Sequence, residues 1–414
     1  MFWDDPRIDP STYFRIAQHH QSSALFPSLR RLTYSLDTGL ISRSYIFLFL
    51  SPLLDSLELF NIRGFENTIV GPFLATLSSE SQMLSQIILH SGRMSVDILK
   101  NVVVHFKQLR SLELLDAVFM SDFTLWEVLG TLPSLASLTL KATDPNSHPA
   151  HAPENSNSQS GAPKYFAALE SLCVKGSFFF IQHLLGFIDS PCLKSIEVYS
   201  VIDHNERDPD NLFTSSMTIV ASKWSQSLKS LVIDSSSSNL KTTQRHVISN
   251  CLMLLTVFHE MQAFQLTGWK MKNLNDDVIR LVTSWPKLRS LGVLPLDQTF
   301  ISFPTLRRIA ENCPELRCLH IQLDTSIIPP FDNSSKCLHH NLEVLTVGKA
   351  HPSSGRAATN IQTSLACQIQ ATQHLDSIFP YLKTIKVHPD NDVMWSGIRD
   401  LVHLCQDANL RRVK

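Results

Sequence analysis

Short hexapeptides with a regular apolar pattern recur along the chain. Their first, fourth and sixth positions are apolar, as in residues 288–293 and 316–321, which begin 28 residues apart. Side chains alternate along a β-strand, so the fourth and sixth positions point to one face and the residues around them point to the other. We therefore predict one half-buried strand per hexapeptide. When any bulky apolar residue is accepted at the first position, the hexapeptides begin at Leu29, Leu54, Leu84, Leu109, Leu135, Leu169, Leu193, Leu228, Met261, Leu288, Leu316, Leu342 and Leu382.

The segments between the hexapeptides have the apolar spacing of helices. Proline ends a helix and favours extended geometry in the residue before it, as a helix-to-strand junction requires. Ser95, Asp122 and Asn275 each precede residues with helical spacing, so we expect them to be N-caps. Residues 361–378 and, near the N-terminus, residues 11–18 also predict helices. Proline stands two residues before the opening apolar residue at Pro27, Pro133, Pro191, Pro286, Pro314 and Pro380.

A strand that alternates with a helix at a period of roughly 20–30 residues is the sequence signature of a leucine-rich repeat. The chain therefore predicts an α/β fold, a right-handed horseshoe-shaped solenoid with a parallel sheet on the concave side and helices on the convex side. We assign residues 1–25 to a lead-in or cap and residues 26–414 to a solenoid of about 13 repeats. Residues 143–164 are rich in Pro, Ser and Asn and predict a disordered loop. Residues 410–413 could be a last partial copy.

Composition supports an extensive core and argues against several classes of partner. Of the 414 residues, 43% are hydrophobic and 18% are charged, and the formal net charge is −1. A nearly neutral chain provides no electrostatic footprint for nucleic acid or for an anionic membrane. The most apolar runs, 45–50 and 178–188, are shorter than the ~18 residues needed to span a bilayer. Eight cysteines form no C-x-x-C pair, so we expect a reduced cytoplasmic or nuclear protein without membrane attachment.

The sequence contains no recognisable motif for catalysis or for a cofactor. The phosphate-loop, nucleophile-elbow, dinucleotide-binding and zinc-protease patterns are all missing. The pair His339–His340 with Glu343 could suggest metal ligands, but adjacent histidines on an extended segment diverge, so we interpret them as surface residues. We interpret Cys313 and Cys318 as structural thiols, and Arg207 as part of a solvated charge cluster instead of an arginine finger. We therefore predict a non-enzymatic protein without metal or cofactor.

The outward positions of the predicted strands form the candidate binding surface. Their chemistry is mixed and has no single sign of charge, which suits a protein partner better than a phosphate backbone. Most of these residues are expected to be solvated strand positions. Aromatic and long basic side chains carry much of the binding energy of interfaces, and this selects a few candidates on the concave face. They are Lys141, Lys175, Glu197 and Tyr199, which we expect to lie close together, and His320.

The units Trp285–Leu291 and Cys313–Ile321 resemble the leucine-rich repeats of F-box proteins, and the degenerate fungal members are similar in style. The resemblance covers residues 26–413. It implies that the repeats are the substrate-binding arm of an SCF (cullin-RING) ubiquitin ligase, with a protein substrate on the concave face. It also implies that an F-box upstream of the repeats would dock on the Skp adaptor and the cullin.

Two features depart from that family. Its repeats usually place Asn or Cys eight residues after the opening leucine, where this chain has residues such as Ala117 and Ser177, so we expect no regular ladder of buried side-chain hydrogen bonds. Residues 1–25 are too few for the three helices of an F-box, which indicates a truncated gene product or an absent docking function. Two alternatives stay open: a leucine-rich-repeat scaffold or adaptor unrelated to ubiquitination, and a leucine-rich-repeat GTPase activator. The second is less favoured, because residues 410–414 do not form the acidic tail of that class.

Overall fold

In the part of the chain that the computed structural model describes, thirteen strands follow one another in chain order, and most are separated by a helix. The chain divides into one unit made of Met1–Lys194 and Val201–Glu206 and a second unit made of Ser195–Ser200 and Arg207–Lys414. The described residues are 25–36, 42–62, 67–91, 95–117, 123–142, 165–200, 209–235, 249–296, 299–325, 328–331, 337–338, 340–348, 365–387 and 392–413.

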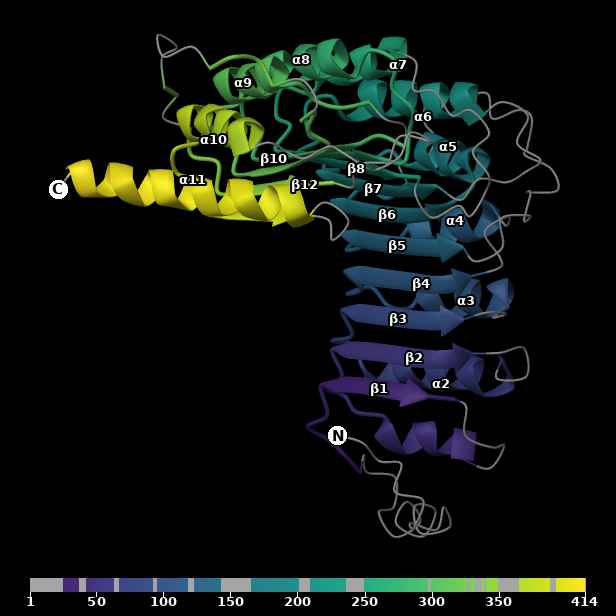
Figure 1. The fold of residues 1–414 in the computed structure, drawn as a ribbon. Coiled ribbons are helices and arrows are strands. Elements are labelled where there is room, and N and C mark those ends of the chain that lie inside the picture. Colours follow the sequence, from purple (N-terminus) through teal and green to yellow (C-terminus); the bar gives the residue numbers. More distant parts are fainter. Residues whose placement is uncertain are drawn as a thin grey trace, which may run out of the picture. The chain divides into compact units, whose positions relative to one another are not determined.

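The first unit contains six strands that pair in parallel with their neighbours in the sequence (Figure 1). The strands are β1 (Arg31–Ser35), β2 (Ser56–Ile62), β3 (Gln86–Ser91), β4 (Ser111–Ala117), β5 (Ser137–Ala142) and β6 (Ser171–Gly176). The helices are η1 (Ser42–Phe49), α2 (Asn67–Glu80), α3 (Val96–Val103), α4 (Phe123–Gly130) and α5 (Phe178–Phe187). Helices α2, α3 and α4 contact one another in turn and lie along one face of the strands.

The second unit repeats this arrangement with seven parallel strands. The strands are β7 (Ser195–Ser200), β8 (Ser230–Asp234), β9 (Ala263–Thr267), β10 (Ser290–Leu294), β11 (Cys318–Ile321), β12 (Val344–Val347) and β13 (Thr384–Val387). The helices are α6 (Pro209–Trp224), α7 (Ser249–Leu254), η3 (Leu255–Val257), α8 (Leu274–Ser284), α9 (Phe303–Asn312), α10 (Leu365–Ile378) and α11 (Asp392–Val413). The predicted α/β leucine-rich-repeat solenoid is thereby confirmed.

Every strand begins two residues after the apolar residue that opens its hexapeptide, as the sequence predicts. The opening residue, the third and the fifth after it point into the core. In the copy that contains β10, Leu288, Leu291 and Val293 are at most 1% exposed. Burial of one such side chain contributes roughly 1.5–3 kcal/mol. Because the apolar side chains of each copy are covered by the copies beside it, the stability of each unit is approximately a sum of interactions between neighbouring copies.

The turns that precede β2 to β6 and β9 to β13 are each tied to the preceding copy by a recurring pair of backbone hydrogen bonds. The amides of Arg317 and Cys318 both donate to the carbonyl oxygen of Arg289, at 2.8 and 3.0 Å. The amides of Ser85 and Gln86 donate to the carbonyl of Asp55 in the same way, at 2.9 and 3.0 Å. These bonds satisfy buried backbone groups and fix the register between neighbouring copies independently of side-chain identity.

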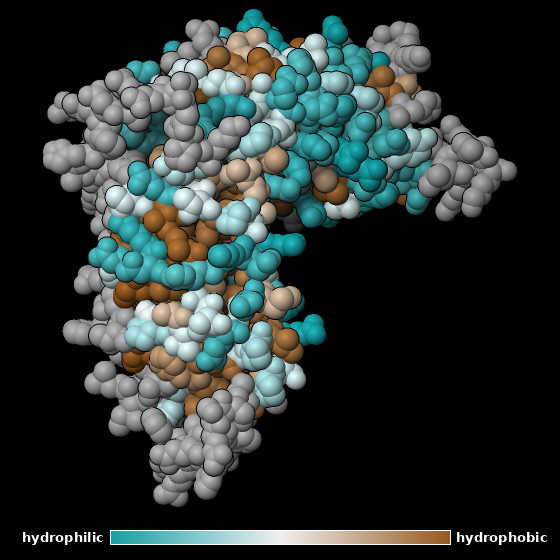
Figure 2. All heavy atoms as spheres, turned by 180° about the vertical axis from the view of Figure 1, so that it is seen from behind, coloured by the Kyte–Doolittle hydropathy of each residue, from teal (hydrophilic) through white to brown (hydrophobic). Residues whose placement is uncertain are grey.

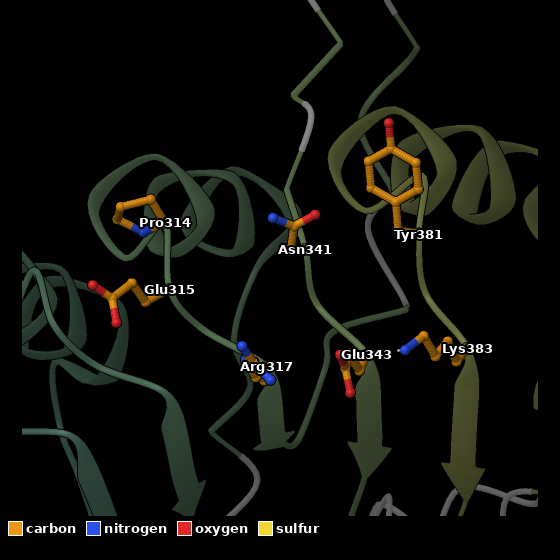
Figure 3. A pocket seen from close by; sticks show the side chains of 7 residues that line it. All are labelled: Pro314, Glu315, Arg317, Asn341, Glu343, Tyr381 and Lys383. Carbon is orange, nitrogen blue, oxygen red and sulfur yellow. Dashed lines mark ion pairs between the residues drawn. The ribbon is translucent and has the colours of Figure 1, made fainter.

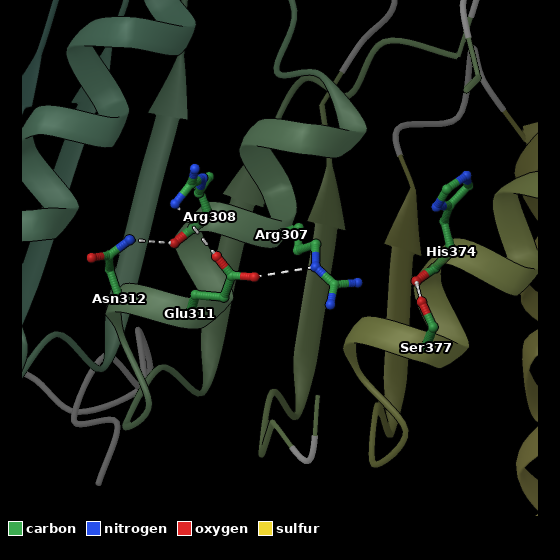
Figure 4. A network of polar contacts seen from close by, with 6 residues as sticks. All are labelled: Arg307, Arg308, Glu311, Asn312, His374 and Ser377. Atoms are coloured by element: carbon green, nitrogen blue, oxygen red, sulfur yellow. Dashed lines mark hydrogen bonds and ion pairs between the residues drawn. The ribbon is translucent and has the colours of Figure 1, made fainter. Parts of the chain in front are cut away.

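Helices α9 and α10 of the second unit carry polar contacts that lie within one helix (Figure 4). On α9, Arg307 Nε is 3.1 Å from Glu311 Oε1, one helical turn further on. On α10, the Ser377 hydroxyl donates to the carbonyl oxygen of His374 at 2.9 Å. An exposed ion pair such as that of Arg307 and Glu311 contributes about 0.2–0.5 kcal/mol to its own helix.

The structure corrects two local predictions. Ser95 occupies the N-cap position of α3 as predicted, but its side chain makes no capping hydrogen bond. The N-cap position of α8 is held by Asn273, and Asn275 lies inside that helix. The Asn275 side chain instead accepts from the Ser302 amide at 2.9 Å and donates to the Phe300 carbonyl at 3.2 Å, so it links two copies. Residues 410–413 belong to the end of α11 and do not form a strand.

Some predictions fall on residues outside the described ranges. These are the helix at 11–18, the loop at 143–164, the cap at Asp122, and the side chains of Arg207 and His339. None of the helices in the described ranges has the length and the apolar character that a membrane span requires.

Candidate protein-recognition face

The outward residues of the strands, which are the second, fourth and sixth after each opening residue, form what we call the exposed strand face. Strand pairing places these residues in register from one strand to the next within each unit. In the first unit, for example, Glu58 lies beside Ile88, and Ile88 lies beside Glu113. The exposed strand face thus consists of rows, and each repeat contributes one residue to each row. The inward residues of the same strands pack in the core.

In the first unit, the row formed by the sixth residue after each opening residue contains an aromatic stack. The rings of Phe60 and His90 are stacked with centroids 4.1 Å apart. The His90 Nε2 atom also lies 3.4 Å from Glu58 Oε1, and both of these side chains are only about a quarter exposed. Leu115 follows His90 in the same row. The row therefore presents a half-buried aromatic and aliphatic surface, of the kind that is enriched in the cores of protein interfaces.

The same row continues into the predicted lysine pair. Lys141 on β5 and Lys175 on β6 are direct register partners. Neighbouring strands are ~4.8 Å apart, so the two ammonium groups are carried by adjacent backbones. Lys141 is exposed, Lys175 is half-buried, and neither has an ion pair with a residue of the described part of the chain. Like charges directly opposite each other are unfavourable, and an anionic group from a partner would relieve that repulsion.

In the second unit, Glu197 and Tyr199 form the other predicted pair. They are two residues apart on β7 and therefore on one face of the strand. The Tyr199 hydroxyl donates a hydrogen bond to Glu197 Oε2 at 3.1 Å. Tyr199 also lies in register with Asp234 on β8. This hydrogen bond holds the tyrosine ring along the strand face.

His320 lies on β11, between Gly292 of β10 and Thr346 of β12. It is half-buried, and burial lowers the pKa of its imidazole below the ordinary value of 6.5. Four strand steps separate β11 from β7, which corresponds to about 19 Å at the usual strand spacing. His320 therefore does not join Tyr199 in a common cluster.

The structure thus brings the five predicted residues together only in part. Lys141 pairs with Lys175 in the first unit, and Glu197 pairs with Tyr199 in the second. A common site made of both pairs stays a prediction. The stack of Phe60 on His90 was not singled out from the sequence. Both residues are the sixth after the opening residue in adjacent copies, and this shared place is the signal from which the stack could have been predicted.

Of the histidine and cysteine residues considered as metal ligands, His340 and Cys313 have structural roles. His340 is 5% exposed, so its interpretation as a surface residue was wrong. Its Nε2 atom lies 2.8 Å from the carbonyl oxygen of Cys313, and its Nδ1 atom accepts from the amide of Leu342 at 3.1 Å. These bonds require a neutral ring protonated on Nε2, and burial accordingly lowers its pKa. Among the described residues, no group of three or more His, Cys, Asp or Glu could hold a metal ion.

Cys313 and Cys318 differ in environment. Cys313 follows α9, is fully buried, and has its Sγ atom 3.6 Å from the carbonyl oxygen of Trp285. Burial raises the pKa of this thiol to about 12, so it stays protonated, as expected for a structural thiol. Cys318 is exposed at the start of β11.

The side of the molecule turned away from the view of Figure 1 has hydrophobic patches between hydrophilic residues (Figure 2). Large exposed hydrophobic residues in the first unit include Leu53, which is 47% exposed, and Met83, which is 63% exposed. Both precede the opening leucine of their copies. Apolar residues are therefore accessible at the turns of the first unit as well as on its strand face.

No protein-family model matches the sequence, and no curated protein matches it significantly. Among solved structures, the chain is similar to the Rad7–Elc1 complex from yeast, with 14% identity, 93% of this chain and 84% of that chain covered, and a TM-score of 0.49. It is also similar to an internalin (inlF) from Listeria monocytogenes, with 13% identity, 94% and 93% covered, and a TM-score of 0.39. The leucine-rich repeat-containing protein LegL7 from Legionella pneumophila gives 12% identity, 90% and 98% covered, and a TM-score of 0.44. The fold class rests on the strand pairing and register described above.

Proposed function

We propose that this protein is a non-enzymatic recognition module that binds another protein through its exposed strand face. The observation that carries the proposal is the row formed by Phe60, His90, Leu115, Lys141 and Lys175 on the first unit. The core does not need an aromatic stack or two adjacent lysines on the outward side of the strands. Aromatic side chains are enriched in the cores of interfaces, and a pair of adjacent cations adds charge complementarity to an acidic partner.

A partner for this row would combine apolar and acidic groups. Its apolar side chains would cover the stack of Phe60 on His90, and its carboxylates would lie against Lys141 and Lys175. Such an arrangement places the charges at the edge of an apolar contact, where they guide association and specificity more than affinity. Glu197, Tyr199 and His320 are proposed as contacts for a protein partner on the exposed strand face of the second unit.

We further propose that the module is the substrate-binding arm of an SCF ubiquitin ligase. This finer assignment is supported by the resemblance of Trp285–Leu291 and Cys313–Ile321 to the repeats of F-box proteins. In that role the repeats hold the substrate, and other subunits transfer ubiquitin. A scaffold without a ligase link would use the same exposed strand face, so the two functions differ only in the adaptor that binds.

The recognition proposal is tested by affinity purification with the wild-type chain and with the double variant Lys141→Glu/Lys175→Glu. We expect proteins retained by the wild type to be depleted at least tenfold with the double variant, because two cations become anions at the contact. Lys107→Glu, an exposed charge reversal on the turn before β4, is the matched control and should retain them. Equal retention by all three proteins would contradict a binding role for the lysine pair.

The ligase assignment has a separate test. The chain, extended by the sequence upstream of Met1 in its gene, is mixed with purified Skp adaptor and analysed by gel filtration. Co-elution supports the substrate-arm assignment. If neither the chain nor the extended version binds the adaptor, the ligase assignment is wrong and the scaffold alternative remains.

A further inference from the structure

A second surface of the second unit lies at the turns that lead into its last strands. In each copy, the residues immediately before and after the opening apolar residue project from these turns. We call the two rows from β9 to β13 the strand-start edge. The residues before the opening residue are Glu260, Lys287, Glu315, Asn341 and Tyr381, and those after it are Gln262, Arg289, Arg317, Glu343 and Lys383.

A hollow of about 390 Å³ opens on this edge at β11, β12 and β13 (Figure 3). Its volume is at the lower end of the range of small ligand sites, ~300–1,000 Å³. It therefore has room for a side chain with adjoining backbone. The lining residues come from three consecutive copies and are Pro314, Glu315, Arg317, Asn341, Glu343, Tyr381 and Lys383.

Most charges of the strand-start edge are already engaged with one another. Lys287 Nζ lies 2.7 Å from Glu260 Oε1. Arg289 Nε lies 3.1 Å from Glu315 Oε2, which belongs to the next copy. At the other side of the hollow, Lys383 Nζ lies 3.3 Å from Glu343 Oε1, the ion pair marked in Figure 3. The two glutamates that line the hollow each form an ion pair with a basic residue, which reduces their negative charge but does not remove it.

Arg317 differs from its neighbours on this edge. It is exposed, lines the hollow between Glu315 and Glu343, and has no ion pair with a described residue. Its backbone is fixed, because its amide donates to Arg289 and its carbonyl accepts from the amides of Glu343 and Val344, both at 2.9 Å. A guanidinium offers a planar fork of donors that matches a carboxylate bidentately. The hollow thus contains one unengaged cation on a rigid base.

The other residues of the hollow can contact the backbone and the neighbouring side chains of a peptide whose carboxylate lies at Arg317. Tyr381 also lines the hollow and is 50% exposed, so part of its side chain is accessible to a partner. Asn341 is exposed, and its amide can both donate to and accept from a peptide backbone. Glu315 and Glu343 disfavour a compact dianion such as phosphate, because their own charges lie on either side of Arg317.

We propose that this hollow binds an acidic side chain in an extended segment of a partner protein. The carboxylate of that segment lies on the Arg317 guanidinium, its apolar neighbour packs on the Tyr381 ring, and its backbone contacts Asn341. The site is at the strand-start edge of the second unit and is independent of the exposed strand face proposed above.

The test uses a fluorescein-labelled peptide of eight residues with alternating Glu and Leu between capped ends, measured by fluorescence anisotropy with the full chain. We expect a dissociation constant below about 1 mM. Arg317→Gln should weaken binding at least tenfold, and Arg317→Lys should weaken it less, because an ammonium keeps the charge but loses the fork. Tyr381→Ala should weaken binding severalfold. Lys287→Gln is the matched control, since it removes one cation of the same edge outside the hollow, and should change affinity less than twofold.

Several results would overturn the proposal. The first is that no binding is seen at 1 mM peptide. The second is that Arg317→Gln binds the peptide as tightly as the wild type does while its thermal melt is unchanged. The third is that the wild type binds a peptide with Gln in place of Glu equally well. Displacement of the peptide by equimolar inorganic phosphate would show a site for a bare anion and would also overturn it. The double variant Lys141→Glu/Lys175→Glu should still bind the peptide, so failure of the strand-face proposal and failure of this one are distinguishable.

Discussion

The first unit and the last copies of the second unit present different surfaces because their strands differ in length. In the first unit, β2 to β6 have six or seven residues, and the strands therefore include the sixth position after the opening residue. In the second unit, β11, β12 and β13 have four residues and end before that position. The first unit thus carries a full row from Phe60 to Lys175 on its strand face. In the last copies of the second unit, the sixth residue after the opening residue lies outside the strand. The charged residues of these copies lie mostly at the strand-start edge.

The same repeat can therefore offer recognition at two places without a change in its core. Inward positions are restricted to apolar residues in both units, since an uncovered or polar group there would cost burial energy. Outward and turn positions have no such restriction. Strand length decides which of these positions are held rigidly, and rigid positions make the better binding surface because less entropy is lost on binding.

The largest effect is expected from charges placed in the core of each unit. Leu112→Asp in the first unit and Leu291→Asp in the second bury an unpaired carboxylate at sites that are at most 1% exposed. Each should destabilise its unit by more than about 4 kcal/mol, measured by urea unfolding with circular dichroism. Val232→Asp, at an outward and half-buried position of β8, is the control and should cost much less. An unchanged unfolding curve for Leu291→Asp would mean that Leu291 does not face inward.

A smaller effect is expected at His340, which occupies the place before β12 where other copies have proline. His340→Gln should lose about 1–3 kcal/mol at pH 7.5, because the buried amide of Leu342 loses its acceptor. The pKa of His340 is lowered in the folded protein, so folding disfavours its protonation. Its contribution is complete above the ordinary pKa of 6.5 and is lost as the pH falls from there toward the lowered value.

The measurement is the difference in free energy of unfolding between wild type and His340→Gln across pH 7.5 to 5. We expect that difference to shrink as the pH falls. A difference that stays constant or grows would show that the ring is not held in the neutral form.

The smallest effect concerns the lysine pair. Lys141→Glu places opposite charges on neighbouring strands where like charges now face each other, and should stabilise the chain by about 0.2–1 kcal/mol. Urea unfolding in low salt should show the gain, and it should fall in 0.5 M salt because exposed charges are screened. A loss of stability in low salt would indicate that Lys141 already has a favourable contact.

The strand positions could be predicted because the signal is local. The apolar pattern of each hexapeptide marks its own strand, and Met261 opens β9 as reliably as Leu316 opens β11. Contacts between copies were missed. Asn275 was predicted as a cap from its neighbours in sequence, but its partners Phe300 and Ser302 are 25 and 27 residues away.

The candidate binding surfaces could be predicted only where their residues are close in sequence. The pair Glu197 and Tyr199 follows from their spacing on one strand, whereas the hollow beside Arg317 requires three turns that are distant in sequence. Residues 410–413 fit the strand pattern by composition alone, yet they continue α11. A four-residue apolar and basic run is compatible with either element, and tertiary packing decides between them.

Both surfaces depend on parallel copies stacked in one register, and hydrogen–deuterium exchange of the free chain tests this stacking most directly. We predict slow exchange for the amides of the first residue of β2 to β6 and of β9 to β13, for example Ser111 in the first unit and Cys318 in the second, which donate to the preceding copy at 2.9 and 3.0 Å. Exchange of these amides as fast as that of an unstructured peptide would contradict it.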